Sequence, residues 1–110
     1  MSVQTPQKLA VIDVGSNSIR MVIYERAGAA LLPYFNEKTM AELGRGLLNT
    51  SQLNPDGVTL ALETLERFRA ILSSLSITEV YAAATAAVRV AEDGETFRKM
   101  AERALGVPLR

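Results

Sequence analysis

Two apolar segments joined by four small polar residues most constrain how this chain can fold. The first, Leu9–Val14, carries one acid, Asp13; the chain then passes through Gly15–Ser18 and becomes apolar again over Ile19–Tyr24. Two β-like segments this close together predict an antiparallel hairpin. The nearly continuous apolar character of residues 8–14 predicts a central strand buried on both faces, so Asp13 is expected to be a buried acid.

The turn of this hairpin has the composition of an anion-binding site. Backbone N–H groups, small polar side chains and a guanidinium two residues further on are groups that bind phosphate. Glycine at the first turn position is expected to adopt a conformation that is costly for other residues. The alternative is an ordinary hairpin turn with a solvated arginine. The candidate phosphate-binding residues are Gly15, Ser16, Asn17, Ser18 and Arg20.

A buried Asp13 would need a partner. The turn's own N–H groups or a metal ion with its waters are the partners that suit a carboxylate in this position. The turn-capping role of an ordinary hairpin is the alternative for this acid. Asp13 is therefore the candidate metal ligand.

A second candidate stretch follows a strand expected over residues 77–83. It consists of small residues over Ala82–Val88, with Thr85 among them and Arg89 after them. Ligands gather at the carboxyl ends of strands in α/β sheets, so Thr85 and Arg89 are candidate site residues. The alternative is that the alanines pack in the core and the arginine is solvated. Arg45 has two similar interpretations: it could contact a ligand, or it could lie in an ordinary surface loop.

The remaining pattern gives the order β-β-β-α-β-α. A third strand is expected over residues 31–38, at a sheet edge or a bulge because Pro33 lies in it. Helices are expected from Pro55 to about Ser74, with Asn54 as N-cap, and over residues 94–105, with Asp93 as cap. Glu63 and Arg67 are spaced as an i,i+4 ion pair. Residues 107–110 resemble the start of another strand.

This order predicts an α/β domain with a mixed sheet. It resembles the ribonuclease-H-like half-domain of the actin, Hsp70 and sugar-kinase ATPase superfamily. In those proteins the first hairpin turn holds phosphate, in a cleft closed by a second half.

Composition excludes several classes of chemistry. The 110 residues contain no Cys and no His, which excludes thiol and imidazole catalysis and Cys/His zinc sites. A metal would need oxygen ligands, as magnesium and calcium do. The 12 acids balance the 12 bases, so we expect no nucleic-acid binding by bulk charge. We also expect no signal peptide, no membrane span and a cytoplasmic location.

Two sequence blocks carry a family resemblance. Residues Ala10–Arg20 and Ala84–Ala91, the latter followed by Gly94–Phe97, resemble motifs of the exopolyphosphatase / guanosine pentaphosphate phosphohydrolase (Ppx/GppA) family. Leu43–Leu47 and the helix after it also fit in place and spacing. The resemblance covers essentially the whole chain and identifies residues 1–110 as one domain, the first part of an amino-terminal phosphatase domain.

The resemblance implies a function. The expected reaction is magnesium-dependent removal of terminal phosphate from inorganic polyphosphate or guanosine pentaphosphate. By position, Gly15–Ser18 would hold phosphate and Asp13 would organise the Mg²⁺ or its waters. Arg20 and Arg89 would contact the substrate's phosphates, and Thr85 would lie at the cleft wall.

The chain also departs from the family pattern. The catalytic glutamate of a Ser-Gly-x-Glu-Glu-like segment and the second glycine-rich phosphate turn are not found in it; the glutamate is expected beyond Arg110. The chain alone is therefore expected to supply half a cleft and to be inactive. The alternatives are a nucleotide-binding sensor or kinase half-domain, and a self-associating non-catalytic unit. An exposed half-cleft and an unpartnered last strand predict a homodimer.

Overall fold

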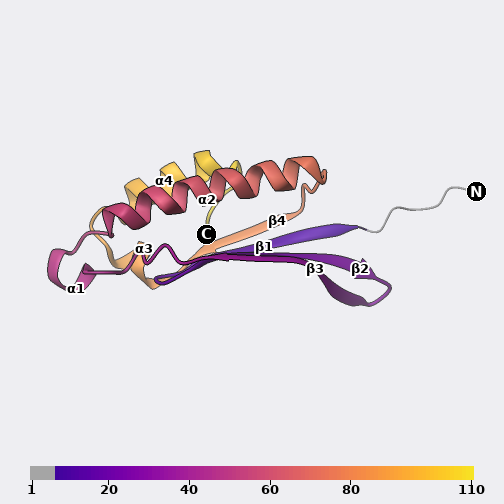
Figure 1. Cartoon of the computed structure of the whole chain (residues 1–110), viewed down its shortest axis with the longest axis horizontal. Coiled ribbons are helices and arrows are strands. Elements are labelled where there is room, and N and C mark those ends of the chain that lie inside the picture. The colour runs from indigo at the N-terminus through magenta and orange to yellow at the C-terminus, as the bar shows by residue number, and fades with distance from the viewer. Residues whose placement is uncertain (1–6) are drawn as a thin grey trace, which may run out of the picture.

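The computed structural model describes residues 7–110, and the expectations about residues 1–6 lie outside them. The chain folds into one mixed four-stranded sheet in the order β3-β2-β1-β4, in which β1 is antiparallel to β2 and parallel to β4 (Figure 1). The strands are β1 (Lys8–Val14), β2 (Ile19–Ala27), β3 (Ala30–Thr39) and β4 (Val80–Ala84). The helices are α1 (Leu47–Thr50), α2 (Pro55–Ser74), α3 (Ala86–Val90) and α4 (Gly94–Leu105).

The predicted element order is confirmed, with two short helices added. The β1–β2 hairpin forms, and both long helices begin and end where the sequence placed them. Pro33 lies in the edge strand β3 beside a register shift between Ile23 and Tyr24, so both of its expected positions are realised. Strand β4 begins later than predicted because Ile77 still donates to the carbonyl of Leu72 and closes the end of α2.

The long helices α2 and α4 cover one face of the sheet and leave the other face open (Figure 1). The expectation that β1 is buried on both faces is therefore wrong. Its residues alternate, with Ile12 and Val14 fully buried, whereas Val11 is 40% exposed and Asp13 is exposed. The largest buried side chains between the sheet and the helices are Phe68, Phe97, Ile12, Ile19, Met21, Ile23, Leu43, Leu53, Leu65 and Val14.

Three polar side chains have partners other than the expected ones. Neither Asn54 nor Asp93 caps its own helix with a side-chain hydrogen bond. Asp93 Oδ1 instead accepts from the N–H of Leu53 at 2.9 Å. Arg67 pairs with Glu37 of β3 and not with a residue of its own helix. Local spacing predicts local partners, and in these cases a neighbouring segment competes successfully.

The last residues lie along the free side of β4. The N–H of Arg110 donates to the carbonyl of Ala82 at 3.0 Å, and the N–H of Ala84 donates to the carbonyl of Arg110 at 2.6 Å. The two bonds follow the pattern of a parallel pair, but residues 107–110 do not form the expected strand. Between residues 7 and 110 no helix is long and apolar enough to cross a membrane.

Candidate phosphate site

The turn between β1 and β2 is closed by a hydrogen bond from the N–H of Gly15 to the carbonyl of Ser18 at 2.9 Å. The reason for glycine here differs from the expected one, because Gly15 is not among the residues with positive φ. A Cβ at this position would lie 3.0 Å from the Ser18 carbonyl oxygen, so glycine is needed for space. The tightness of the turn therefore depends on the missing side chain.

A second segment, residues 42–44, is hydrogen-bonded to the turn. The N–H of Glu42 donates to the carbonyl of Asn17, and the N–H of Gly44 donates to the carbonyl of Ser16, each at 2.9 Å. A Cβ on Gly44 would lie 3.2 Å from that of Ser16, so a side chain there would crowd the turn. These bonds occupy two of the turn's carbonyl oxygens, those of Ser16 and Asn17, which would otherwise repel an anion.

The turn's own N–H groups remain free. Within residues 7–110 the backbone N–H groups of Ser16, Asn17 and Ser18 donate to no protein acceptor. Successive unpartnered N–H groups in a tight turn form a concavity that suits an anion. The arrangement can therefore bind an anion through the backbone. Ser16, Asn17 and Ser18 also carry polar side chains.

Thr85 lies beside this turn. Its N–H and its Oγ1 both donate to the carbonyl of Val14, at 3.0 and 3.4 Å. A Cβ on Gly15 would come within 3.8 Å of Thr85 Oγ1. The parallel pairing of β1 and β4 thus brings together two candidate stretches that are far apart in the sequence.

The three candidate arginines lie in different places. Arg20 is exposed on the open face, directly opposite Asp13 in the β1–β2 register. Arg89 is exposed in the last turn of α3 and lines a separate hollow of about 270 Å³. Arg45 is largely exposed in the loop, with its Nη1 3.5 Å from Glu42. The remaining residues of the Arg89 hollow are Ala84, Val88, Ala91, Glu92, Gly94, Glu95, Arg98 and Arg110.

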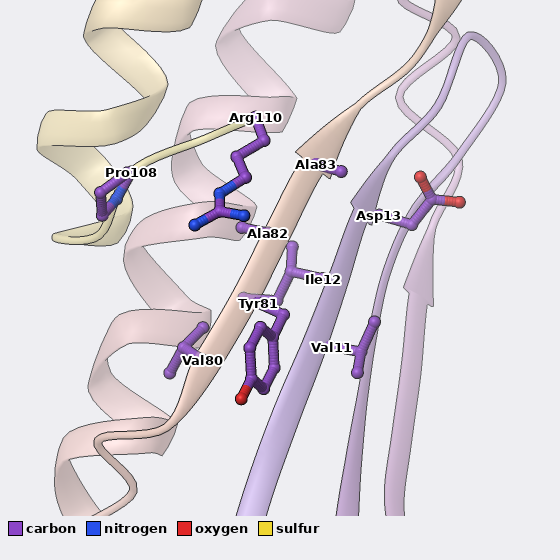
Figure 2. Close-up of a pocket in the computed structure, with 9 residues that line it drawn as sticks. All are labelled: Val11, Ile12, Asp13, Val80, Tyr81, Ala82, Ala83, Pro108 and Arg110. Carbon is purple, nitrogen blue, oxygen red and sulfur yellow. The ribbon is translucent and has the colours of Figure 1, made fainter.

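Asp13 is exposed, so it is not the buried acid that the sequence predicted. It lies at one side of a hollow of about 470 Å³ on the open face, with Arg110 at the other side in Figure 2. In residues 7–110 no three His, Cys, Asp or Glu residues are grouped closely enough to hold a metal. One carboxylate still fits Mg²⁺, which commonly keeps its waters and takes its other ligands from substrate phosphates.

An ion pair that sequence reasoning missed lies on the same open face. The guanidinium of Arg26 donates to both carboxylate oxygens of Glu79, at 2.7 and 2.9 Å, and the Tyr81 hydroxyl donates to Glu79 Oε2 at 2.7 Å. The bonds from Arg26, and then from Tyr81, lower the pKa of Glu79 to about 2. Only the alternation of residues along β2 and β4 hinted that these side chains share a face.

Comparison with known proteins shows which family the chain belongs to. Residues 7–110 match the Ppx/GppA phosphatase family. The chain belongs to this family. The family resemblance drawn from the two sequence blocks is thus confirmed.

Solved structures of this family share the fold. The chain is similar to the Aquifex aeolicus Ppx/GppA family member, with a TM-score of 0.90 and 24% identity over 96% of this chain and 35% of that one. It is also similar to an exopolyphosphatase from Cytophaga hutchinsonii, with a TM-score of 0.85 and 26% identity over 94% of this chain and 33% of that one. It is similar as well to an exopolyphosphatase-like protein, with a TM-score of 0.86 and 26% identity over 97% of this chain and 33% of that one.

These matches confirm the predicted α/β fold with a mixed sheet. The chain spans about a third of the length of the solved structures that it matches.

Proposed function

We propose that this chain supplies one wall of the cleft of a phosphohydrolase that removes the terminal phosphate of inorganic polyphosphate or guanosine pentaphosphate. The observation that carries the proposal is the turn at Gly15–Ser18. Glu42 and Gly44 occupy the carbonyls of Asn17 and Ser16, while within residues 7–110 the N–H groups of Ser16–Ser18 are free. Membership of a phosphatase family supports hydrolysis, and the likeness to an exopolyphosphatase supports a phosphate-chain substrate.

In this proposal the turn binds one phosphate and the arginines bind others. Arg89 follows Thr85 by four residues, which places it about 6 Å further along the α3 axis. It therefore suits a neighbouring phosphate of a chain better than the one in the turn. Arg20 and Arg89 are both exposed, so their guanidinium groups are accessible for paired hydrogen bonds to phosphate oxygens.

Asp13 is the residue that would hold a magnesium ion through its waters. Bound there, Mg²⁺ would offset negative charge on the phosphate oxygens. The chain's own residues would position the phosphate and stabilise its charge, which is most of what phosphoryl transfer asks of a protein. We assign the water-activating carboxylate to a part of the protein outside residues 1–110, so this chain alone would bind the substrate without cleaving it.

Two measurements test the proposal. Calorimetric titration of the chain with tripolyphosphate should show binding, and Gly15→Ala should weaken it about tenfold because the turn must open. Unchanged affinity in Gly15→Ala would remove the turn from the site. ATP serves as the competing ligand, and tight binding of ATP with none of tripolyphosphate would favour a nucleotide-binding module instead.

The second measurement concerns Arg89. In the longer protein with Mg²⁺, phosphate release from polyphosphate should fall on the order of 100-fold in Arg89→Ala. Lys99→Ala is the matched control, because it removes one exposed positive charge from α4 and should leave release unchanged. Equal rates in the two variants would contradict the role given to Arg89.

A further inference from the structure

The segment that is hydrogen-bonded to the turn, residues 42–44, contains a residue with an unusual backbone conformation. Glu42 has φ of 54°, in the left-handed region that non-glycine residues rarely occupy. Its N–H holds the carbonyl of Asn17, and its own carbonyl accepts from the Asn54 side chain, Nδ2, at 3.1 Å. A strained residue thus lies between the candidate phosphate turn, Gly15–Ser18, and the start of α2.

The Asn54 side chain donates a hydrogen bond to this segment and does not cap its own helix. Asparagine is among the best N-cap residues, yet its side chain makes no cap hydrogen bond at the start of α2. Its backbone N–H also points to the loop and donates to the carbonyl of Leu43 at 3.0 Å. The side chain and the backbone of one residue therefore hold two successive carbonyls of the loop.

The first turn of α2 packs against the same loop. Gly57 is buried in the first turn of α2, and a Cβ there would lie 2.4 Å from the Ala41 carbonyl oxygen and 3.3 Å from that of Glu42. The helix backbone therefore lies directly against the loop backbone. The loop has no room to move towards the helix, and Asn54 prevents it from moving away.

We infer that Asn54 is a positioning residue for the phosphate turn. Its amide fixes Glu42, Glu42 fixes the Asn17 carbonyl, and the N–H groups of Ser16 and Asn17 are thereby left facing the anion. If the amide is lost, Glu42 can relax from its strained φ and release that carbonyl. This inference rests on the proposed function, because it assigns a support to the same turn.

The test uses Asn54→Ser, which keeps a good and uncharged N-cap but lacks an amide that reaches Glu42. Affinity of the chain for tripolyphosphate should fall about fivefold, while the thermal midpoint stays near that of the parent chain. Thr59→Ala is the control, since Thr59 is exposed on the same helix and its hydroxyl, within residues 7–110, donates only to the carbonyl of Pro55. Its affinity should equal that of the parent.

A measurement on the free protein separates this inference from the proposed function. Amide NMR resonances of Ser16 and Asn17 should shift in Asn54→Ser and stay in place in Thr59→Ala, without any ligand. Unshifted resonances, or equal tripolyphosphate affinity of Asn54→Ser and the parent, would overturn the inference. If the resonances shift in Asn54→Ser but the parent chain binds no tripolyphosphate, the proposed function fails and the support of the turn by Asn54 stands.

Discussion

The N–H of Thr85 donates to the carbonyl of Val14 at 3.0 Å, and this bond fixes the end of β4 against the start of the candidate phosphate turn, Gly15–Ser18. Two segments that are 71 residues apart meet here. The meeting follows from the parallel register of the two strands, in which Val14 pairs with Ala84. The geometry of the candidate site is therefore set by sheet pairing, and changes that disturb the packing of the strands should disturb the site.

Gly94→Ala should be among the most damaging single changes in the chain. A Cβ at Gly94 would lie 1.7 Å from the carbonyl oxygen of Val88, so α4 would have to move away from α3. We expect a loss of at least about 3 kcal/mol of the free energy of unfolding, measured by urea denaturation. The control is Gly46→Ala, where φ is +77° but an added Cβ would have no described atom within 4 Å apart from its chain neighbours. It should cost only about 1–2 kcal/mol.

Phe68→Ala should remove much of the packing between α2 and the sheet. The Phe68 side chain is fully buried, and its truncation should lower the free energy of unfolding by about 3–5 kcal/mol. Leu60→Ala on the same helix is the comparison, because Leu60 is 40% exposed and should cost less than about 1 kcal/mol. Similar losses in the two variants would show that α2 does not pack as described.

The elements that could be predicted from the sequence are those whose signals are local. Helix α2 begins at Pro55 and α4 ends before Gly106, because proline and glycine act on the residues next to them. The apolar spacing of Leu65, Phe68 and Leu72 identified the buried face of α2 in the same way. For these elements tertiary contacts reinforce the local preference.

The features that the sequence could not give depend on segments that meet only in the fold. Asn54 and Asp93 were predicted to cap their helices, and each is used by a neighbouring loop. Asp13 was predicted to be buried, because a nearly continuous apolar run suggests two covered faces. Gly15 was expected to need an unusual backbone, yet it needs only space beside Ser18. No local pattern distinguishes these cases.

The predicted homodimer can be tested through the open face of the sheet. Val11 and Tyr81 are 40% and 55% exposed there, beside the hollow shown in Figure 2. If this face mediates association, sedimentation at two protein concentrations should show a dimer fraction that rises with concentration. Val11→Lys should abolish that dimer, because it places a charge in an apolar contact. A monomer at both concentrations would contradict the homodimer.

Protonation of Glu79 should make stability depend on pH in acid. Its pKa is lowered from 4.5 to about 2 in the folded chain by Arg26, so the folded state binds the proton less readily than the unfolded state. The stabilisation is complete above about pH 4.5 and is lost as the pH falls through about 2. Glu79→Gln should therefore flatten the fall in thermal midpoint over this range.

The matched control for this prediction is Glu66→Gln, since Glu66 is exposed on α2 and takes part in no ion pair among residues 7–110. Its acid profile should follow that of the parent chain. Arg26→Met should flatten the profile as Glu79→Gln does, because Glu79 without its guanidinium returns towards its ordinary pKa. If Glu79→Gln and the parent lose stability in parallel between pH 4.5 and 2, the ion pair does not couple protonation to folding.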